Sequence, residues 1–97
     1  MGFDGYMKYE VIHTNKILKQ LKLMEKRQKD MDKFKEVVSL LAMGTSLPEK
    51  YKDHALKGRY KGYRDCHIEP DWILIYQIDN DKLILHLFET GTHSDLF

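Results

Sequence analysis

Apolar residues change their spacing about halfway along this 97-residue chain, and that change restricts the possible folds more than any other feature of the sequence. Over residues 14–44 they recur every three or four positions, which is the period of a helix face. Over residues 60–88 they form short runs bounded by glycine, proline and aspartate, which is typical of strands. With a short strand ahead of the helices, the pattern predicts the order β-α-α-β-β-β. The expected fold class is α+β, with two N-terminal helices packed on an antiparallel sheet of about four strands.

Both predicted helices begin at a capping residue and carry one apolar face. A short strand is expected over Tyr9–Ile12, and Thr14 then stands at an N-cap position. Asp30 caps the second helix, and Gly44 ends it in the C′ position. The two apolar faces consist of Ile17, Leu18, Leu21 and Met24, and of Met31, Phe34, Val37, Val38 and Leu41.

The second half of the chain predicts a loop and three strands. Residues Thr45–Lys57 contain a proline and several polar residues, so we expect a loop there. Pro70 separates two strands because proline donates no ladder hydrogen bond. Asp79-Asn80-Asp81 favours a turn, and Thr90-Gly91-Thr92 is predicted to turn the chain into a short tail. The expected strands are Tyr60–Ile68, Trp72–Ile78 and Leu83–Phe88.

Length and composition limit the class of protein. A chain of 97 residues forms one domain, which we place at residues 7–97 behind an extension at residues 1–6. No apolar run approaches the about 20 residues that span a bilayer, and no charged-then-apolar leader is present. One cysteine, Cys66, forms no internal disulfide and supplies no zinc cage. We therefore expect a cytoplasmic protein without a metal or cofactor.

The formal net charge of +1 conceals a strong asymmetry along the chain. Residues 8–64 hold 15 basic and 7 acidic residues, a net charge of +8, whereas residues 65–97 hold 1 and 7, a net charge of −6. A basic front part favours a polyanion or an acidic partner. Lysines that merely solvate helix surfaces explain the same statistics equally well.

Histidines are the most informative chemical groups in the chain. His54, His67 and His93 all fall in loops or at strand ends, where functional groups are usually displayed. Asp71 and Trp72 flank the same corner as His67. The other two histidines, His13 beside the first N-cap and His86 within a strand, are interpreted as structural or incidental.

Several kinds of catalytic site are disfavoured by spacing. No H-x₃-H or C-x₂-C pair is present, and Cys66 and His67 point to opposite faces of a strand. No nucleophile-elbow glycines surround a serine. Imidazoles on a basic surface suit RNA cleavage instead, because the 2′-hydroxyl of RNA supplies the nucleophile. The protein then needs one proton acceptor, one proton donor and cations near the phosphate.

Three segments carry a resemblance to a known family. They are Tyr51–Gly58 (YKDHALKG), Gly62–Tyr76 (GYRDCHIEPDWILIY) and Thr90–Phe97 (TGTHSDLF). Together and in this order they closely resemble the YafQ family of bacterial toxins, within the RelE/ParE superfamily. The resemblance runs from about Met7 to Phe97 and implies a RelE-like fold.

This resemblance implies a type II toxin that acts as an endoribonuclease. Such a protein cuts mRNA in the A site of the 70S ribosome, uses no cofactor, and is neutralised by a DinJ/RelB-like antitoxin in a hetero-oligomer. The motifs assign proton transfer and phosphate stabilisation to four residues, with His93 as the general acid and Asp71 or His54 as the base. The implied catalytic residues are His54, His67, Asp71 and His93. The implied substrate contacts are Trp72, Phe97, Arg64, Lys52 and Arg59, with Trp72 equally open to a core role.

One position departs from the family pattern. Some relatives carry an arginine just before the TGTH turn, where this chain has Glu89. A carboxylate near the cleaved phosphate would repel it, so either Glu89 points away or Lys52, Arg59 or Arg64 compensates. Glu89 therefore keeps open a catalytically weak antitoxin-binding module. The other alternative is a ParE-like toxin without nuclease activity, against which the three histidines argue.

Overall fold

The computed structural model describes residues 7–97, so the extension predicted at residues 1–6 lies outside the described residues. Two short 3-10 turns, η1 (Glu49–Tyr51) and η2 (Gly58–Tyr60), lie on either side of the second strand. No helix in the described part of the chain has the length and apolar character needed to cross a membrane. The helices and strands are β1 (Glu10–His13), α1 (Asn15–Lys26), α2 (Met31–Ala42), β2 (His54–Ala55), β3 (Arg64–Glu69), β4 (Trp72–Asp79), β5 (Ile84–Gly91) and α3 (His93–Leu96).

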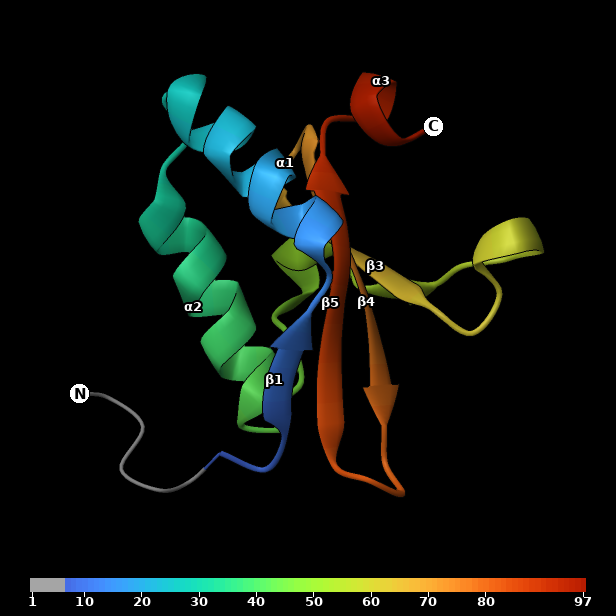
Figure 1. Ribbon diagram of the computed structural model, residues 1–97. Helices are drawn as coiled ribbons and strands as arrows, with labels where there is room; N and C mark the ends of the chain where they lie inside the picture. The colour runs from blue at the N-terminus through green and yellow to red at the C-terminus, as the bar shows by residue number, and fades with distance from the viewer. Residues whose placement is uncertain (1–6) are drawn as a thin grey trace.

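The sheet is mixed and has five strands in the order β1-β5-β4-β3-β2, which corrects the predicted antiparallel sheet of about four strands. Neighbours from β2 to β5 are antiparallel, whereas β1 runs parallel to β5. The chain leaves β1 at one edge, passes through both helices, and enters the sheet again at the opposite edge (Figure 1). From there β2, β3, β4 and β5 follow one another as antiparallel neighbours, which places β5 beside β1. The α+β class itself is confirmed.

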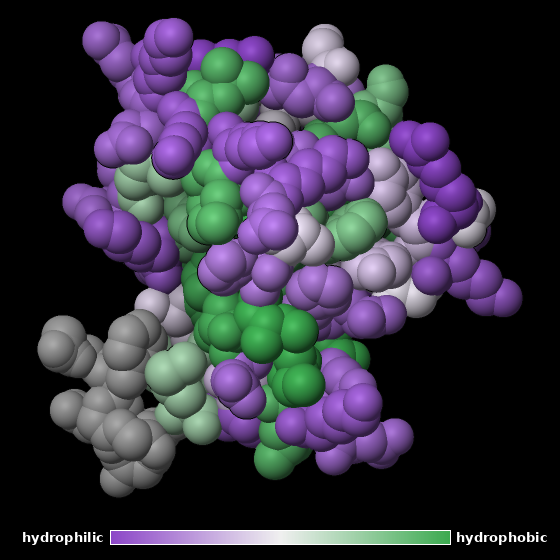
Figure 2. Space-filling model, viewed as in Figure 1, coloured by the Kyte–Doolittle hydropathy of each residue, from purple (hydrophilic) through white to green (hydrophobic). Residues whose placement is uncertain are grey.

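Both long helices begin where the sequence predicts, and α2 ends before Gly44 as predicted. The Thr14 hydroxyl accepts the backbone N–H of Ile17 at 3.0 Å, and the Asp30 carboxylate accepts that of Asp32 at 3.0 Å. Gly44 has a φ of +76°, a left-handed conformation that suits glycine after a helix. Lysines line the outer surface of α1, and Figure 2 shows hydrophilic side chains over much of this face, with a hydrophobic patch where β1 lies.

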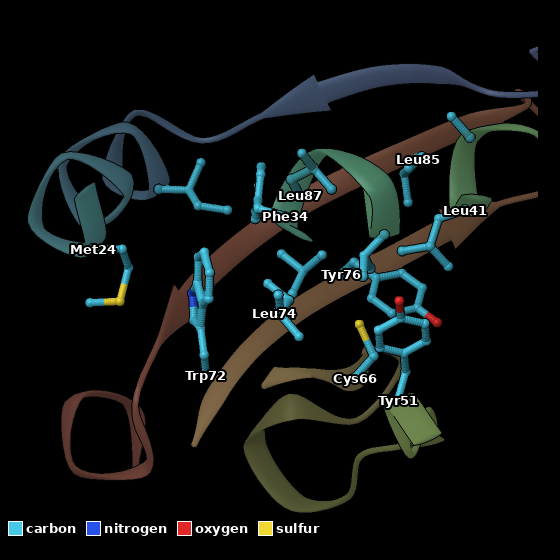
Figure 3. Close-up of a cluster of buried hydrophobic side chains, with 14 of the residues drawn as sticks. Met24, Phe34, Leu41, Tyr51, Cys66, Trp72, Leu74, Tyr76, Leu85 and Leu87 are labelled. Atoms are coloured by element: carbon cyan, nitrogen blue, oxygen red, sulfur yellow. The ribbon is translucent and has the colours of Figure 1, made fainter. Parts of the chain in front are cut away.

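A hydrophobic core lies between the two long helices and one face of the sheet. Trp72, Leu74 and Tyr76 alternate from β4 into this layer. Figure 3 shows them meeting side chains of both helices, and Trp72 stacks on Phe34 with ring centroids 6.2 Å apart. Cys66, with no exposed surface, lies in the same layer.

The opposite face of the sheet carries a second, smaller cluster. Ile73 and Ile75 point to this side of β4 and pack with Leu96 of α3. Tyr60, Tyr63 and Phe88 partly cover it. Since neither long helix covers this side, the ends of β2, β3 and α3 remain accessible there.

Two strand boundaries differ from prediction by three residues or more, and others by a single residue. β3 begins at Arg64 rather than Tyr60, because Gly58–Tyr60 forms a 3-10 turn and Gly62 has a φ of +94°. β5 continues to Gly91, and residues 93–96, predicted as a tail, form α3. Thr90 permits the longer strand because its hydroxyl accepts Trp72 Nε1–H at 2.9 Å and donates to the Ile73 carbonyl at 2.7 Å.

Candidate active site

The helix-free face of the sheet gathers the functional groups that the sequence places far apart. Asp65 and His67 alternate with the core-facing residues of β3, so they point to this face. His54 of β2 is the register partner of Asp65. His93 opens α3, directly after β5 brings the chain back beside β4.

His93 is held by Asp71, a residue 22 positions earlier in the chain. The ring Nδ1 lies 2.7 Å from Asp71 Oδ1, and the backbone N–H of His93 donates to the same oxygen at 3.0 Å. Because an ionised carboxylate only accepts, this contact places the proton on Nδ1. The ring therefore presents Nε2 to a substrate, as an acceptor when neutral and a donor when protonated.

The Nδ1 atoms of His67 and His54, like that of His93, each lie near an oxygen atom. The His67 ring lies 5.6 Å from the His93 ring, and its Nδ1 lies 3.3 Å from the Pro70 carbonyl oxygen. The His54 Nδ1 lies 2.8 Å from the Lys52 carbonyl oxygen. Each Nδ1 thus faces an oxygen acceptor, and each imidazole keeps Nε2 for chemistry.

Asp65 is a site residue that the sequence analysis did not single out. Its carboxylate is buried, with Oδ1 3.1 Å from His54 Nδ1. Burial raises the pKa of Asp65 above its ordinary value, whereas the nearby imidazoles of His54, His67 and His93 act to lower it. Within residues 7–97, Asp65 Oδ1 accepts no hydrogen bond. The strand alternation that places His67 on this face was the available signal for Asp65.

Asp71 differs from Asp65 in exposure and in acidity. The Asp71 carboxylate is exposed, and the two hydrogen bonds from His93 lower its pKa below the ordinary value. It therefore remains ionised and is a weaker proton acceptor than an ordinary aspartate. This geometry suits a group that orients His93.

An aromatic side chain borders the imidazoles, and two cations lie on neighbouring segments of the chain. Phe97 is 59% exposed, with its ring 6.3 Å from that of His93 and 5.8 Å from that of Tyr60. The Arg59 guanidinium lies over the Tyr60 ring at 5.0 Å. Lys52 is exposed immediately before the loop segment that carries His54.

Two of the expected substrate contacts lie elsewhere. Trp72 has no exposed surface, so it is a core residue and does not line the site. Arg64 points to the helix side of the sheet, because it precedes Asp65 in the alternation of β3. There its guanidinium binds Asp53 through two hydrogen bonds, at 3.1 and 3.3 Å.

The carboxylate of Glu89 is engaged by residues of α1 and by Tyr60. Its buried carboxylate lies 3.2 Å from Lys16 Nζ and accepts hydrogen bonds from Gln20 and Tyr60, each at 3.4 Å. The predicted repulsion of a bound phosphate is therefore reduced by an adjacent cation.

The described residues offer groups for proton transfer rather than a metal cage. Within residues 7–97, no three or more histidine, cysteine, aspartate or glutamate side chains are arranged to hold a metal ion. Three oriented imidazoles, a buried carboxylate and cations on neighbouring segments instead form an arrangement suited to acid–base chemistry on a phosphate.

The structure places the protein in the class of small α+β domains that carry a site suited to acid–base chemistry on a phosphate. Comparisons with known proteins identify the family. The family described as "Bacterial toxin of type II toxin-antitoxin system, YafQ" matches residues 9–97, so the chain belongs to the YafQ toxin family. It is 51% identical over 89 residues to the mRNA interferase toxin YafQ of Escherichia coli K12, covering 91% of this chain and 95% of that protein.

Solved structures of relatives have the same fold. The crystal structure of YafQ from E. coli BL21(DE3) matches with a TM-score of 0.86 and 44% identity, covering 92% of this chain and 98% of that one. The E. coli DinJ-YafQ toxin-antitoxin complex matches with a TM-score of 0.85 and 44% identity, covering 94% and 99%. The expected family is thus confirmed.

Proposed function

We propose that the chain is the toxin of a type II toxin-antitoxin system and cleaves mRNA as a ribosome-dependent endoribonuclease in the cytoplasm. The observation that carries this proposal is the convergence of His67 and His93, with rings 5.6 Å apart, beside His54 and the buried Asp65. Curated relatives are named mRNA interferase toxins, which supports the same activity here. Residues 7–97 would form one RelE-like domain.

The reaction we propose begins with attack of a 2′-hydroxyl on its own 3′-phosphate. His54 Nε2 accepts the hydroxyl proton, the 2′-oxygen–phosphorus bond forms, and the bond to the 5′-oxygen breaks. His93 Nε2–H donates its proton to the departing 5′-oxygen. The products are a 2′,3′-cyclic phosphate and a 5′-hydroxyl. Each such proton transfer accelerates cleavage about 10²–10⁴-fold.

Other side chains around the imidazoles hold the phosphate and a nucleobase of the RNA in this scheme. Asp71 keeps the His93 ring oriented through its Nδ1–H, at 2.7 Å. His67, Lys52 and Arg59 stabilise the charge that develops on the phosphate. The exposed Phe97 ring stacks on an unpaired base, which is how proteins commonly read single-stranded RNA.

The partners follow from the family and from the surface. A solved complex joins the relative YafQ to DinJ, and we propose a DinJ/RelB-like antitoxin for this chain, in a hetero-oligomer. The exposed lysines of α1 would lie against ribosomal RNA while mRNA occupies the A site.

Mapping mRNA 5′ ends in cells tests the proposal. The parent chain, His93→Ala and the matched control His13→Ala are induced, and ends are sequenced from translating ribosomes. We expect codon-phased cuts from the parent and from His13→Ala, because His13 lies outside the site, and none from His93→Ala. Growth arrest that persists in His93→Ala without cuts would replace the proposal with a ParE-like toxin that is not a nuclease.

A further inference from the structure

A hollow of about 520 Å³ adjoins the candidate active site. It lies where α2, η1 and the end of β3 meet, and its lining includes Lys33, Lys50, Lys52, His67 and Pro70. This volume lies within the roughly 300–1,000 Å³ of pockets that bind small organic groups. One residue, His67, belongs to both the hollow and the cluster.

The hollow carries an excess of positive charge. Its two carboxylates are already engaged: Glu36 accepts the Tyr51 hydroxyl at 3.0 Å, and Glu69 lies 3.6 Å from Lys29 Nζ and 3.3 Å from Lys33 Nζ. Within residues 7–97, Lys50 and Lys52 pair with no carboxylate; the Lys50 ammonium lies 5.0 Å over the Tyr51 ring. Two cations therefore remain for an anion that enters the hollow.

Two residues, Lys52 and His67, connect the hollow to the imidazoles. Lys52 lends its side chain to the lining, while its carbonyl oxygen lies 2.8 Å from His54 Nδ1. His67 lines the hollow and lies 5.6 Å from the His93 ring. The hollow is therefore within reach of an RNA strand whose cleaved phosphate lies at the imidazoles.

We propose that the hollow binds the ribose and phosphate of the mRNA nucleotide next to the cleaved bond. The phosphate lies against Lys50, which pairs with no carboxylate among the described residues, and the sugar rests on the apolar wall of Ile68 and Pro70. This inference rests on the proposed nuclease function and adds a second point at which the strand is held. Holding the strand on one side of the cut fixes the reacting phosphate in line with its 2′-hydroxyl.

The experiment combines lysine variants with mRNAs that lack one phosphate charge. Ribosomes are programmed with mRNAs that carry a single uncharged methylphosphonate, placed in turn at each linkage near the cut. Cleavage by the parent, Lys50→Ala and the control Lys82→Ala is followed as kcat/KM. On ordinary mRNA we expect an about tenfold loss for Lys50→Ala and little for Lys82→Ala, which lies in the distant β4–β5 turn.

The informative result is the coupling between lysine and phosphate. One methylphosphonate position should slow the parent by a similar factor, and Lys50→Ala should then cause no further loss at that position. Equal losses for Lys50→Ala on every mRNA would assign the lysines to ribosomal RNA and overturn the inference. Loss of antitoxin affinity with unchanged cleavage would assign the hollow to an acidic peptide, with the same consequence.

Failure of this inference is distinguishable from failure of the proposed function. A parent chain that cleaves no mRNA overturns the nuclease function, whatever the lysine variants do. A parent that cleaves, with His93→Ala inactive and no lysine–phosphate coupling at any position, overturns only the role of the hollow. Unfolding midpoints of the lysine variants, measured alongside, separate lost contacts from lost folding.

Discussion

Trp72 has the size and chemistry of a base-stacking residue, yet none of its surface is exposed. Its ring stacks on Phe34, and its Nε1–H donates to the Thr90 hydroxyl at 2.9 Å. We expect Trp72→Phe to lower the free energy of unfolding by about 2 kcal/mol, through lost packing and one lost buried hydrogen bond. Urea denaturation measures this change.

Cleavage assays on the same variant test the core role of Trp72. The folded fraction of Trp72→Phe should cut mRNA at nearly the parent rate, because no atom of the ring reaches the site. Lost cleavage at unchanged stability would contradict this assignment and return Trp72 to the substrate contacts.

For single residues, the sequence predicted the histidines of the candidate site but not the face of the sheet on which each strand residue lies. His54, His67, Asp71, His93 and Phe97 were all expected, and the structure brings them to one region. Arg64 was expected there too, and Asp65 was not. Residues 72–76 are buried on both faces of β4, so the sequence contains no polar–apolar alternation there to show which face of the paired β3 bears the site.

The short helix α3 is fixed to the rest of the molecule by Asp95. Its carboxylate accepts two hydrogen bonds from Arg27, at 2.9 and 3.4 Å, and one from the Thr92 backbone N–H at 2.9 Å. These bonds, with that from Arg27 the largest, lower the pKa of Asp95 to about 2 from an ordinary 3.8. α3 begins with His93 and is followed by Phe97, so this contact also positions the site.

The pH dependence of α3 follows from that lowered pKa. Because the folded state binds the proton less tightly than the unfolded state, the stabilisation is present above pH about 4 and is lost as the pH falls toward about 2. We expect the Asp95 carboxyl carbon to titrate near 2 by NMR, and to move toward 3.8 in Arg27→Ala. An unchanged midpoint in Arg27→Ala would show that Arg27 is not the cause.

The loop that carries His54 is fixed from the other face of the sheet. Asp53 accepts hydrogen bonds from Arg64 and from the Tyr76 hydroxyl, while β2 itself spans only His54–Ala55. Burial, together with Asp53, raises the pKa of Tyr76, so its hydroxyl remains a donor. A strand of two residues needs such an anchor to hold an imidazole in place.

Tyr76→Phe tests this anchor. Removing the hydroxyl leaves Asp53 with one donor fewer, and we expect the free energy of unfolding to fall by about 1–2 kcal/mol. Amide hydrogen exchange at His54 and Ala55 should accelerate, and cleavage should weaken with it. Tyr63→Phe, on the opposite face of the sheet, is the matched control. Equal exchange rates in both variants would contradict the proposed anchor.

Local sequence signals predicted the helices and strands better than they predicted which strands pair in the sheet. Caps at Thr14 and Asp30 and the helix end at Gly44 were read correctly, because capping depends on a few neighbouring residues. The parallel pairing of β1 with β5 joins segments more than 70 positions apart, such as Glu10 with Ile84, and no local pattern indicates it. β2 is too short to show any periodicity.

At the scale of the molecule, charge is distributed unevenly along the chain. Residues 8–64 carry a net charge of +8, and the exposed lysines of α1 contribute to it. We expect Lys19→Ala/Lys22→Ala to weaken ribosome binding and to reduce its log–log salt slope by about two, with unfolding nearly unchanged. Sedimentation with 70S ribosomes at several salt concentrations measures this, with Lys82→Ala as the control.

Burial of Cys66 has a practical consequence for studying the whole molecule. The thiol has no exposed surface, and burial raises its pKa, so the reactive thiolate is scarce at neutral pH. Because the sequence holds one cysteine, a second one introduced on the surface would be alkylated selectively by maleimide dyes. Fluorescent derivatives for single-molecule tracking are therefore accessible without replacing any native residue of the core.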